Sequence, residues 1–287
     1  MRPLVLLLVL TGCATADPDA RGSSTRDLVN CAWRVCVRTE NTVSGRVYRA
    51  DNDEPVPATI VLTFESPGNL RPGGGQPIER VVPAESSETL VRLSRIVENP
   101  SIRARVTVAI DLGSSTTEPD VDHLYAVPFG GDAPRELIQG FEGAASHLGS
   151  MSYSLDFAMP EGTPVLAARA GIVLYLQDGF TEGGADRDLL EQANLVVVAH
   201  SDETMASYGH LAPGIPVSVG DVVDAGDVLG SSGATGLATE PHLHFHVGLR
   251  MLGTPGRTIP IKLRTRDGRV LDLADASLVE PARPSSR

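Results

Sequence analysis

The sequence of 287 residues is poor in lysine and cysteine, and its basic residues are outnumbered. Lys262 is the only lysine, and 24 basic residues against 36 acidic ones give a formal net charge of −12. Such a chain lacks the basic surface with which proteins bind nucleic acids or anionic membranes. We therefore expect no nucleic-acid partner, and the charge favours solubility.

The apolar run at the N-terminus, Leu4–Leu10, follows Arg2 and is too short to span a bilayer. Its length suits the apolar core of a signal peptide. Leu10-Thr-Gly-Cys13 then resembles the box of bacterial lipoproteins, in which the cysteine is lipidated and begins the mature chain. Ala14 favours outer-membrane sorting, and stable attachment requires more than one acyl chain. An ordinary secretory signal, cut after Ala14 or Ala16, is the alternative.

Lipidation of Cys13 leaves two other cysteines, Cys31 and Cys36, in an oxidising compartment. An unbroken strand over both would hold their Cα atoms roughly 16 Å apart, beyond the reach of a disulfide. A bridge therefore requires a turn around Trp33. We expect a small disulfide loop, and a pair of buried free thiols is the alternative.

The chain is long enough for two domains, each with its own core. Residues 1–12 read as a lipoprotein signal peptide and 13–36 as a tether. Short strands broken by turn residues then predict an immunoglobulin-like β-sandwich over 37–122, in which no catalytic cluster is visible. A second domain is expected over 123–280, followed by a C-terminal tail, 281–287.

The second domain is predicted to be a mainly antiparallel β-sheet with glycine-rich turns. Strand patterns cover 165–168, 171–176, 195–200, 204–210, 222–223 and 242–249. Asp267-Gly268 indicates a hairpin turn, and helical periodicity is convincing only over Asp186–Gln192.

Three of the seven histidines lie two residues apart, at His242, His244 and His246. Successive side chains of a strand alternate between its faces, so the three imidazoles share one face and the apolar residues between them share the other. Imidazoles so placed can serve one metal site, as ligands or as an acid/base group beside a ligand.

Several further blocks appear in a fixed order along the second domain. They are Tyr153-Ser-Leu-Asp-Phe157, Pro160-Glu-Gly-Thr-Pro-Val165, Asn194-Leu-Val-Val-Val-Ala-His200, Tyr208-Gly-His-Leu211, Val219-Gly-Asp-Val-Val223, the glycines at 230, 233 and 236, and His242-Leu-His-Phe245. Together they resemble the lysostaphin-type (LytM-like) zinc endopeptidases of peptidoglycan, over roughly residues 125–275. Leu124–Phe129 and Gln139-Gly140 resemble the leading segment of a subgroup that places a β domain before the peptidase.

The resemblance implies one Zn²⁺ per chain, held by His147, Asp156 and His244. Three protein ligands leave a coordination position open, as a catalytic zinc requires. The resemblance gives His210 and His242 the catalytic roles of activating water and stabilising an oxyanion. Tyr208, two residues before His210, would share its strand face and contact substrate.

One spacing departs from the family. The usual ligand pattern is His-x-x-x-Asp, but the residue four before Asp156 is Ser152. His147 lies nine residues before Asp156, an odd separation that one unbroken strand would place on opposite faces. The Ser146-His147 pair resembles the ligand position of the two-domain subgroup, so we expect a loop or bulge between the two ligands.

The remaining histidines carry weaker expectations. His200 is expected to be structural, His123 has no assigned role, and His246 is expected to line the cleft. These readings predict a zinc endopeptidase that cuts peptidoglycan stems or crosslinks, lipid-anchored in the bacterial envelope and facing the periplasm. An inactive LytM-like activator of a cell-wall amidase is the alternative. A wall- or protein-binding role of the front β domain is a third.

Overall fold

The computed structural model describes residues 8–10, 29–71, 75–98, 102–143, 146–250, 258–265, 267–271, 273 and 278–282. The chain divides into two compact units, Met1–Thr116 and Thr117–Arg287. This boundary lies six residues before the one expected from the sequence, after residue 122. In the described part of the chain, no helix has the length and apolarity needed to cross a membrane.

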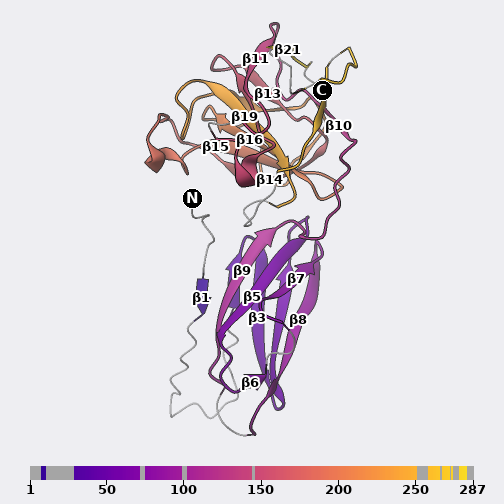
Figure 1. The fold of residues 1–287 in the computed structure, drawn as a ribbon, viewed down its shortest axis with the longest axis vertical. Helices are drawn as coiled ribbons and strands as arrows, with labels where there is room; N and C mark the ends of the chain where they lie inside the picture. Colours follow the sequence, from indigo (N-terminus) through magenta and orange to yellow (C-terminus); the bar gives the residue numbers. More distant parts are fainter. Residues whose placement is uncertain are drawn as a thin grey trace. The chain divides into compact units, whose positions relative to one another are not determined.

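Unit 1 is built from two antiparallel sheets (Figure 1). One sheet has the order β2 (Val29–Ala32), β3 (Val35–Thr42), β4 (Gly45–Asn52), β8 (Ser86–Arg95), β6 (Leu70–Arg71). The other has the order β1 (Leu8–Leu10), β9 (Arg105–Leu112), β5 (Ala58–Ser66), β7 (Ile78–Val82). Tyr48 of β4 meets Phe64 of β5 edge to face, with ring centroids 5.4 Å apart, so the sheets pack through their apolar faces. The narrower immunoglobulin-like assignment stays a prediction.

Two parts of the N-terminal region form strands where the sequence predicted a signal peptide over 1–12 and a tether over 13–36. Residues 29–36 lie in the β2–β3 hairpin, because Val29–Ala32 pairs with the first half of β3. The hairpin turns at Trp33, and Cys31 and Cys36 face each other across it, linked by a disulfide. Leu8–Leu10, assigned above to a signal peptide, pair with β9, while Cys13 lies outside the described residues. The signal peptide and the lipidation of Cys13 stay predictions.

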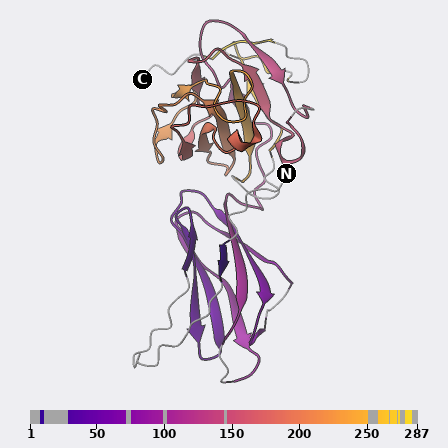
Figure 2. The ribbon, with the colours of Figure 1, turned by 90° about the vertical axis from the view of Figure 1, so that its left-hand side faces the viewer.

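Unit 2 is organised around an eight-stranded sheet, seen from two sides in Figures 1 and 2. Its order is β17 (Val222–Val223), β14 (Gly171–Gln177), β15 (Asn194–Ala199), β16 (Met205–Leu211), β19 (His242–Gly248), β12 (Leu155–Ala158), β11 (Arg135–Gln139), β21 (Leu278–Val279). Two-stranded sheets join β10 (Leu124–Ala126) to β20 (Lys262–Arg264), and β13 (Pro164–Leu166) to β18 (Val228–Ser231). Every pairing in the large sheet is antiparallel, which confirms the mainly β fold class.

The expected helix over Asp186–Gln192 is only the 3₁₀ turn η2 (Arg187–Leu189). The Asp186 side chain caps this turn by accepting a hydrogen bond from the Asp188 backbone N–H, and no second turn follows. The expected turn at Asp267-Gly268 is present, with Gly268 at φ 88° and Arg264 bridged to Val270.

Alternation along the central strands separates an apolar face from a polar one. The apolar side chains of β12 and β19 are fully buried, and they are Leu155, Phe157, Leu243, Phe245 and Val247. The residues between them, among them Asp156 and His244, point to the opposite face. The core thereby fixes which side chains the sheet presents for chemistry.

Candidate metal centre

Asp156 and His244 are brought together by the register of two neighbouring strands. β12 and β19 are antiparallel, and Asp156 pairs directly with His244. Directly opposed residues of an antiparallel pair share a face, so both side chains project from the polar side of the sheet. Oδ1 of Asp156 lies 2.8 Å from Nδ1 of His244.

His147 reaches the same point from a loop rather than from a strand. After His147 the chain turns outward through η1 (Gly149–Met151), with Gly149 at φ 63°, and returns before β12. The returning Ser152 carbonyl accepts a hydrogen bond from the Glu142 N–H, which closes the loop. Because of this loop, the alternation of side chains along a strand no longer places His147 and Asp156 on opposite faces. Ser152 instead donates its hydroxyl to the Gly149 carbonyl.

The three side chains suit a shared cation. One ligand atom from each of His147, Asp156 and His244 lies within 4.8 Å of the others. The fully buried His147 donates from Nδ1 to the Gly140 carbonyl, 2.8 Å away, so its Nε2 carries a lone pair in the neutral ring. That Nε2 lies 3.1 Å from Oδ2 of Asp156. A buried lone pair and a carboxylate directed at one point fit a Zn²⁺ site.

A second layer of side chains orients these three. Nε2 of His244 lies 3.1 Å from Nδ1 of His246, and an N–H on His244 Nε2 would leave its Nδ1 free as a ligand. Gln139 of β11 donates from Nε2 to Oδ2 of Asp156 at 3.1 Å and to Ser146 at 2.7 Å. From the sequence, His246 was expected only to line the cleft, and no ligand-orienting role was predicted for Gln139 or Gly140.

Electrostatics favour the ionised carboxylate. Burial alone would raise the pKa of Asp156, but hydrogen bonds and charge interactions with His147 and His244 outweigh burial and hold it well below its usual range. Burial, with the neighbouring His244 and His147, lowers the pKa of His246 to about 3, so that ring is neutral. A neutral His246 is a suitable acceptor for an N–H of His244.

Two further histidines flank the cluster. His210 and His242 have ring centroids 4.5 Å apart, and His210 lies 6.0 Å from His244 by the same measure. His210 donates from Nδ1 to the Thr235 carbonyl at 2.7 Å, and His242 donates to the Glu240 carbonyl at 2.9 Å. Each neutral ring therefore presents an Nε2 lone pair. Burial, with the charges of His242 and His244, lowers the pKa of His210 to about 4.

Comparisons with known proteins agree with this geometry. Residues 150–255 match the family model described as Peptidase family M23. This part of the chain is therefore similar to the M23 peptidases. The peptidoglycan DD-endopeptidase ShyA of Vibrio cholerae is 36% identical over 117 residues, 41% of this chain and 24% of that protein. Lysostaphin of Staphylococcus simulans is 39% identical over 97 residues, 34% of this chain and 18% of that protein.

Among solved structures, the catalytic domain of a mutant of the prophage-encoded M23 protein EnpA from Enterococcus faecalis is 27% identical. It covers 47% of this chain and 94% of its own, with a TM-score of 0.35. The chain spans a quarter or less of the two curated relatives named above. The matched M23 segment contains Asp156, His210, His242 and His244, while His147 precedes its first residue by three positions.

Tyr208 does not lie at the site, which corrects the expectation for this residue. It is fully buried, its ring packs on Phe245 with centroids 5.1 Å apart, and its hydroxyl accepts from the Ala168 N–H. Burial raises the pKa of Tyr208. The expected shared face with His210 fails because the β15–β16 register shifts beside His210, which has a left-handed φ of 62°. This bulge turns His210 to the polar face of the sheet.

The remaining histidines lie away from the metal cluster. His200 is buried, and its Nδ1 donates to the Ala170 carbonyl at 2.9 Å. Burial lowers the pKa of His200 to about 4, and the nearby Arg169 adds to the shift. His123 packs on Tyr125, with ring centroids 4.9 Å apart. Both positions are structural in character.

Proposed function

We propose that this protein is a zinc-dependent endopeptidase that hydrolyses peptide bonds in the stems or crosslinks of peptidoglycan. One observation carries the proposal: His147, Asp156 and His244 converge on one point beside two histidines with free Nε2 lone pairs. The M23 match and the similarity to the peptidoglycan DD-endopeptidase ShyA support the reaction class and the substrate.

The proposed metal is one Zn²⁺ held by Nε2 of His147, the carboxylate of Asp156 and Nδ1 of His244. Zinc bound there supplies a Lewis acid that makes water a stronger acid near neutral pH. The rest of the chemistry is assigned to residues of the chain. Gln139 and His246 hold the ligands in position, and the buried wall behind them excludes solvent from that side.

His210 and His242 are proposed to divide the work of proton transfer. Burial keeps His210 neutral, so its Nε2 is suited to accept a hydrogen bond from water and orient it. His242 donates from Nδ1 to the Glu240 carbonyl, which leaves its Nε2 to take a proton from the attacking water and pass it to the leaving nitrogen. The protonated ring also stabilises negative charge on the carbonyl oxygen under attack.

The proposed location is the bacterial envelope, with a lipid anchor at Cys13 on the outer membrane and the enzyme facing the periplasm. The sequence around Cys13 supports it. An anchor there would let the enzyme act on the wall while attached to the membrane.

Metal analysis together with digestion of purified peptidoglycan tests the proposal. We expect one zinc per chain, new peptide ends in the muropeptides by mass spectrometry, loss of products with a chelator and recovery on adding zinc. Bound zinc without any new peptide end would favour the amidase-activator alternative. A protein that binds no zinc and releases no peptide would refute the proposal.

A further inference from the structure

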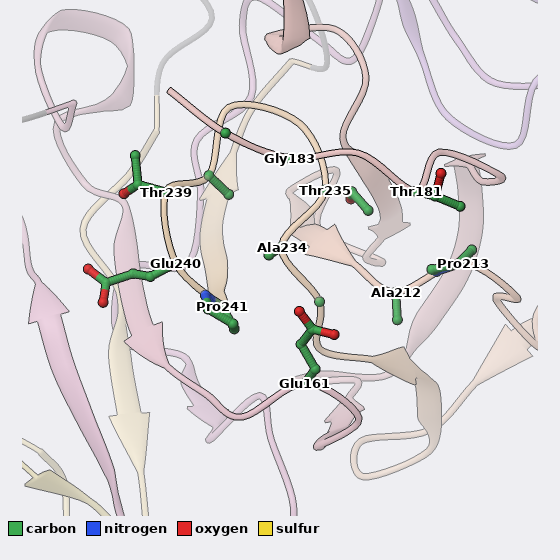
Figure 3. Close-up of a pocket in the computed structure, with 13 residues that line it drawn as sticks. Glu161, Thr181, Gly183, Ala212, Pro213, Ala234, Thr235, Thr239, Glu240 and Pro241 are labelled. Carbon is green, nitrogen blue, oxygen red and sulfur yellow. The ribbon is translucent and has the colours of Figure 1, made fainter. Parts of the chain in front are cut away.

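A pocket of about 320 Å³ opens beside the two flanking histidines (Figure 3). The residues that line it are Glu161, Thr181, Gly183, Gly184, Ala212, Pro213, 233–235 and 238–241. None of the three residues of the metal cluster lines it. Its volume is at the lower end of the range of about 300–1,000 Å³ for small-molecule sites, which suits one side chain of a larger substrate.

The pocket is joined to the reaction centre through the main chain. Thr235, in its wall, accepts the hydrogen bond from His210 Nδ1, and Glu240 accepts the one from His242 Nδ1. A group bound in the pocket therefore lies beside both proton-transfer residues. Under the proposed function, this is the place for a substrate residue next to the bond that is cut.

Close main-chain contacts keep the walls free of large side chains. A Cβ atom on Gly183 would lie 1.5 Å from the Ala234 carbonyl oxygen, and one on Gly233 would lie 2.6 Å from the Ala212 nitrogen. Neither position can carry a side chain without moving the backbone. The walls consequently offer main chain and small side chains, against which an unbranched aliphatic chain can pack.

The charged groups of the lining are both carboxylates, Glu161 and Glu240. Both carboxylates are exposed, and within the described part of the chain neither takes part in a hydrogen bond or an ion pair. Figure 3 shows Glu161 extending its carboxylate toward Ala234, whereas Glu240 points outward. The surrounding segment 171–249 carries eleven acidic residues and a single basic one, Arg187. This field attracts cations and repels anionic groups.

We propose that the pocket binds a primary ammonium group on the substrate peptide and that Glu161 is its specificity-determining partner. The inference rests on the proposed function and adds the substrate class: peptides with a free amine close to the cleaved bond. A side-chain amine and an N-terminal amine share this chemistry. The small side chains of the walls leave room for the methylene chain of a side-chain amine, so this amine is the favoured ligand.

Binding can be tested apart from catalysis by NMR of the zinc-free protein. The probes are Nα-acetyl-lysine amide, its side-chain-acetylated form, and lysine amide blocked only on its side chain. We expect amide shifts at Gly183, Gly184 and Ala234 with the first probe alone. Shifts with only the third probe would identify an N-terminal amine as the ligand. Equal shifts with all three probes, or none, would overturn the pocket assignment.

Chemically matched substrates test the effect on turnover. Crosslinked muropeptides are acetylated, which removes the amine charge, or reductively dimethylated, which keeps it. We expect acetylation to lower kcat/KM about five- to tenfold and dimethylation to change it less than twofold, with the preference shrinking at high salt. If all three substrates are cut equally, the amine proposal is wrong while the proposed function stands. If none is cut, the proposed function fails and the NMR experiment still decides the pocket.

Glu161→Gln is the decisive variant, with Glu182→Gln as its control. Glu182 carries the same charge and directly precedes Gly183 of the pocket wall, but it does not line the pocket. Glu161→Gln should lower kcat/KM for the free-amine substrate about five- to tenfold and leave the acetylated substrate unaffected. Glu182→Gln should leave the ratio between substrates unchanged. Equal effects of the two variants on that ratio would show that the overall negative charge of this surface, and not a specific contact with Glu161, causes the preference.

Discussion

Asp156 and His244 face each other across β12 and β19, with Oδ1 of the carboxylate 2.8 Å from Nδ1 of the imidazole. A slip of β12 by one residue against β19 would turn Asp156 into the core and away from His244. The buried residues between them, such as Phe157 and Leu243, therefore specify the metal centre as firmly as the ligands do. The packing that stabilises the sheet therefore also sets the geometry of the site.

The two histidines of His-x-His should behave differently when replaced. His244→Ala removes a ligand, so we expect zinc and activity to be lost together. His242→Ala should keep the zinc and lose turnover by about 10²–10⁴-fold, mainly in kcat, as expected for an acid/base group. Zinc content and steady-state kinetics measure both effects. Zinc loss in His242→Ala with retention in His244→Ala would reverse the assignment.

Asn194 should act on His210 from a distance. It is fully buried, its side-chain amide donates to the Phe180 and Leu211 carbonyls, and its backbone N–H donates to the Thr235 hydroxyl oxygen. Thr235 in turn holds His210. Asn194→Asp replaces a donor by an acceptor, so we expect a loss of about 1–3 kcal/mol of unfolding free energy for each bond broken. Urea unfolding and kcat, compared with Asn194→Ser, measure the effect; unchanged stability and kcat would contradict it.

Acid should destabilise unit 2 through His200. Burial lowers its pKa to about 4 in the folded state, whereas an unfolded histidine titrates near 6.5. Between these values the unfolded chain binds more protons, so stability is complete above about pH 6.5 and falls toward pH 4. We expect His200 to contribute about 2–3 kcal/mol of the loss between pH 7 and pH 4.5.

The measurement for His200 is urea unfolding of the wild type and of His200→Phe at both pH values. The variant has no titrating group at this position, so its stability should fall less on acidification. His210 and His246 titrate in both proteins and cancel in the difference. An identical fall in the two proteins would show that His200 is not the source.

Cys13 should carry the membrane anchor if the lipoprotein reading of the N-terminus is right. The prediction is that Cys13→Ser accumulates as unprocessed precursor or leaves the membrane fraction, because the acylated residue is gone. Fractionation and intact-mass measurement follow both outcomes. Normal processing and normal membrane retention of the variant would show that Cys13 does not carry an anchor.

The sequence predicts well wherever side-chain alternation along a strand decides the outcome. Asp156, His242 and His244 lie on one face because β12 and β19 are regular and paired. Tyr208 is misplaced by the same rule, because the left-handed backbone at His210 breaks the alternation, and nothing in Tyr208-Gly-His210 announces a bulge. The unusual backbone conformation of one residue, His210, is the reason why Tyr208 lies in the core and not at the substrate site.

Contacts set by loops and strand register are harder to foresee. The loop with η1 separates His147 from β12, so the nine-residue spacing to Asp156 does not predict which face His147 occupies. The resemblance to a subgroup of the family is what identified this residue. The second layer formed by Gly140, Gln139 and His246 depends on which strands become neighbours. Periodicity along a single segment holds no information about such partners.

The zinc affinity of His147→Ala, measured beside Ser152→Ala and the wild type by competition with a chelator, tests the central claim most directly. The account predicts one zinc per chain for the wild type and Ser152→Ala with equal affinity. It predicts an affinity at least about 100-fold weaker for His147→Ala, a loss beyond that of typical second-layer changes. Undiminished zinc affinity in His147→Ala, or loss of zinc in Ser152→Ala alone, would contradict the three-ligand site.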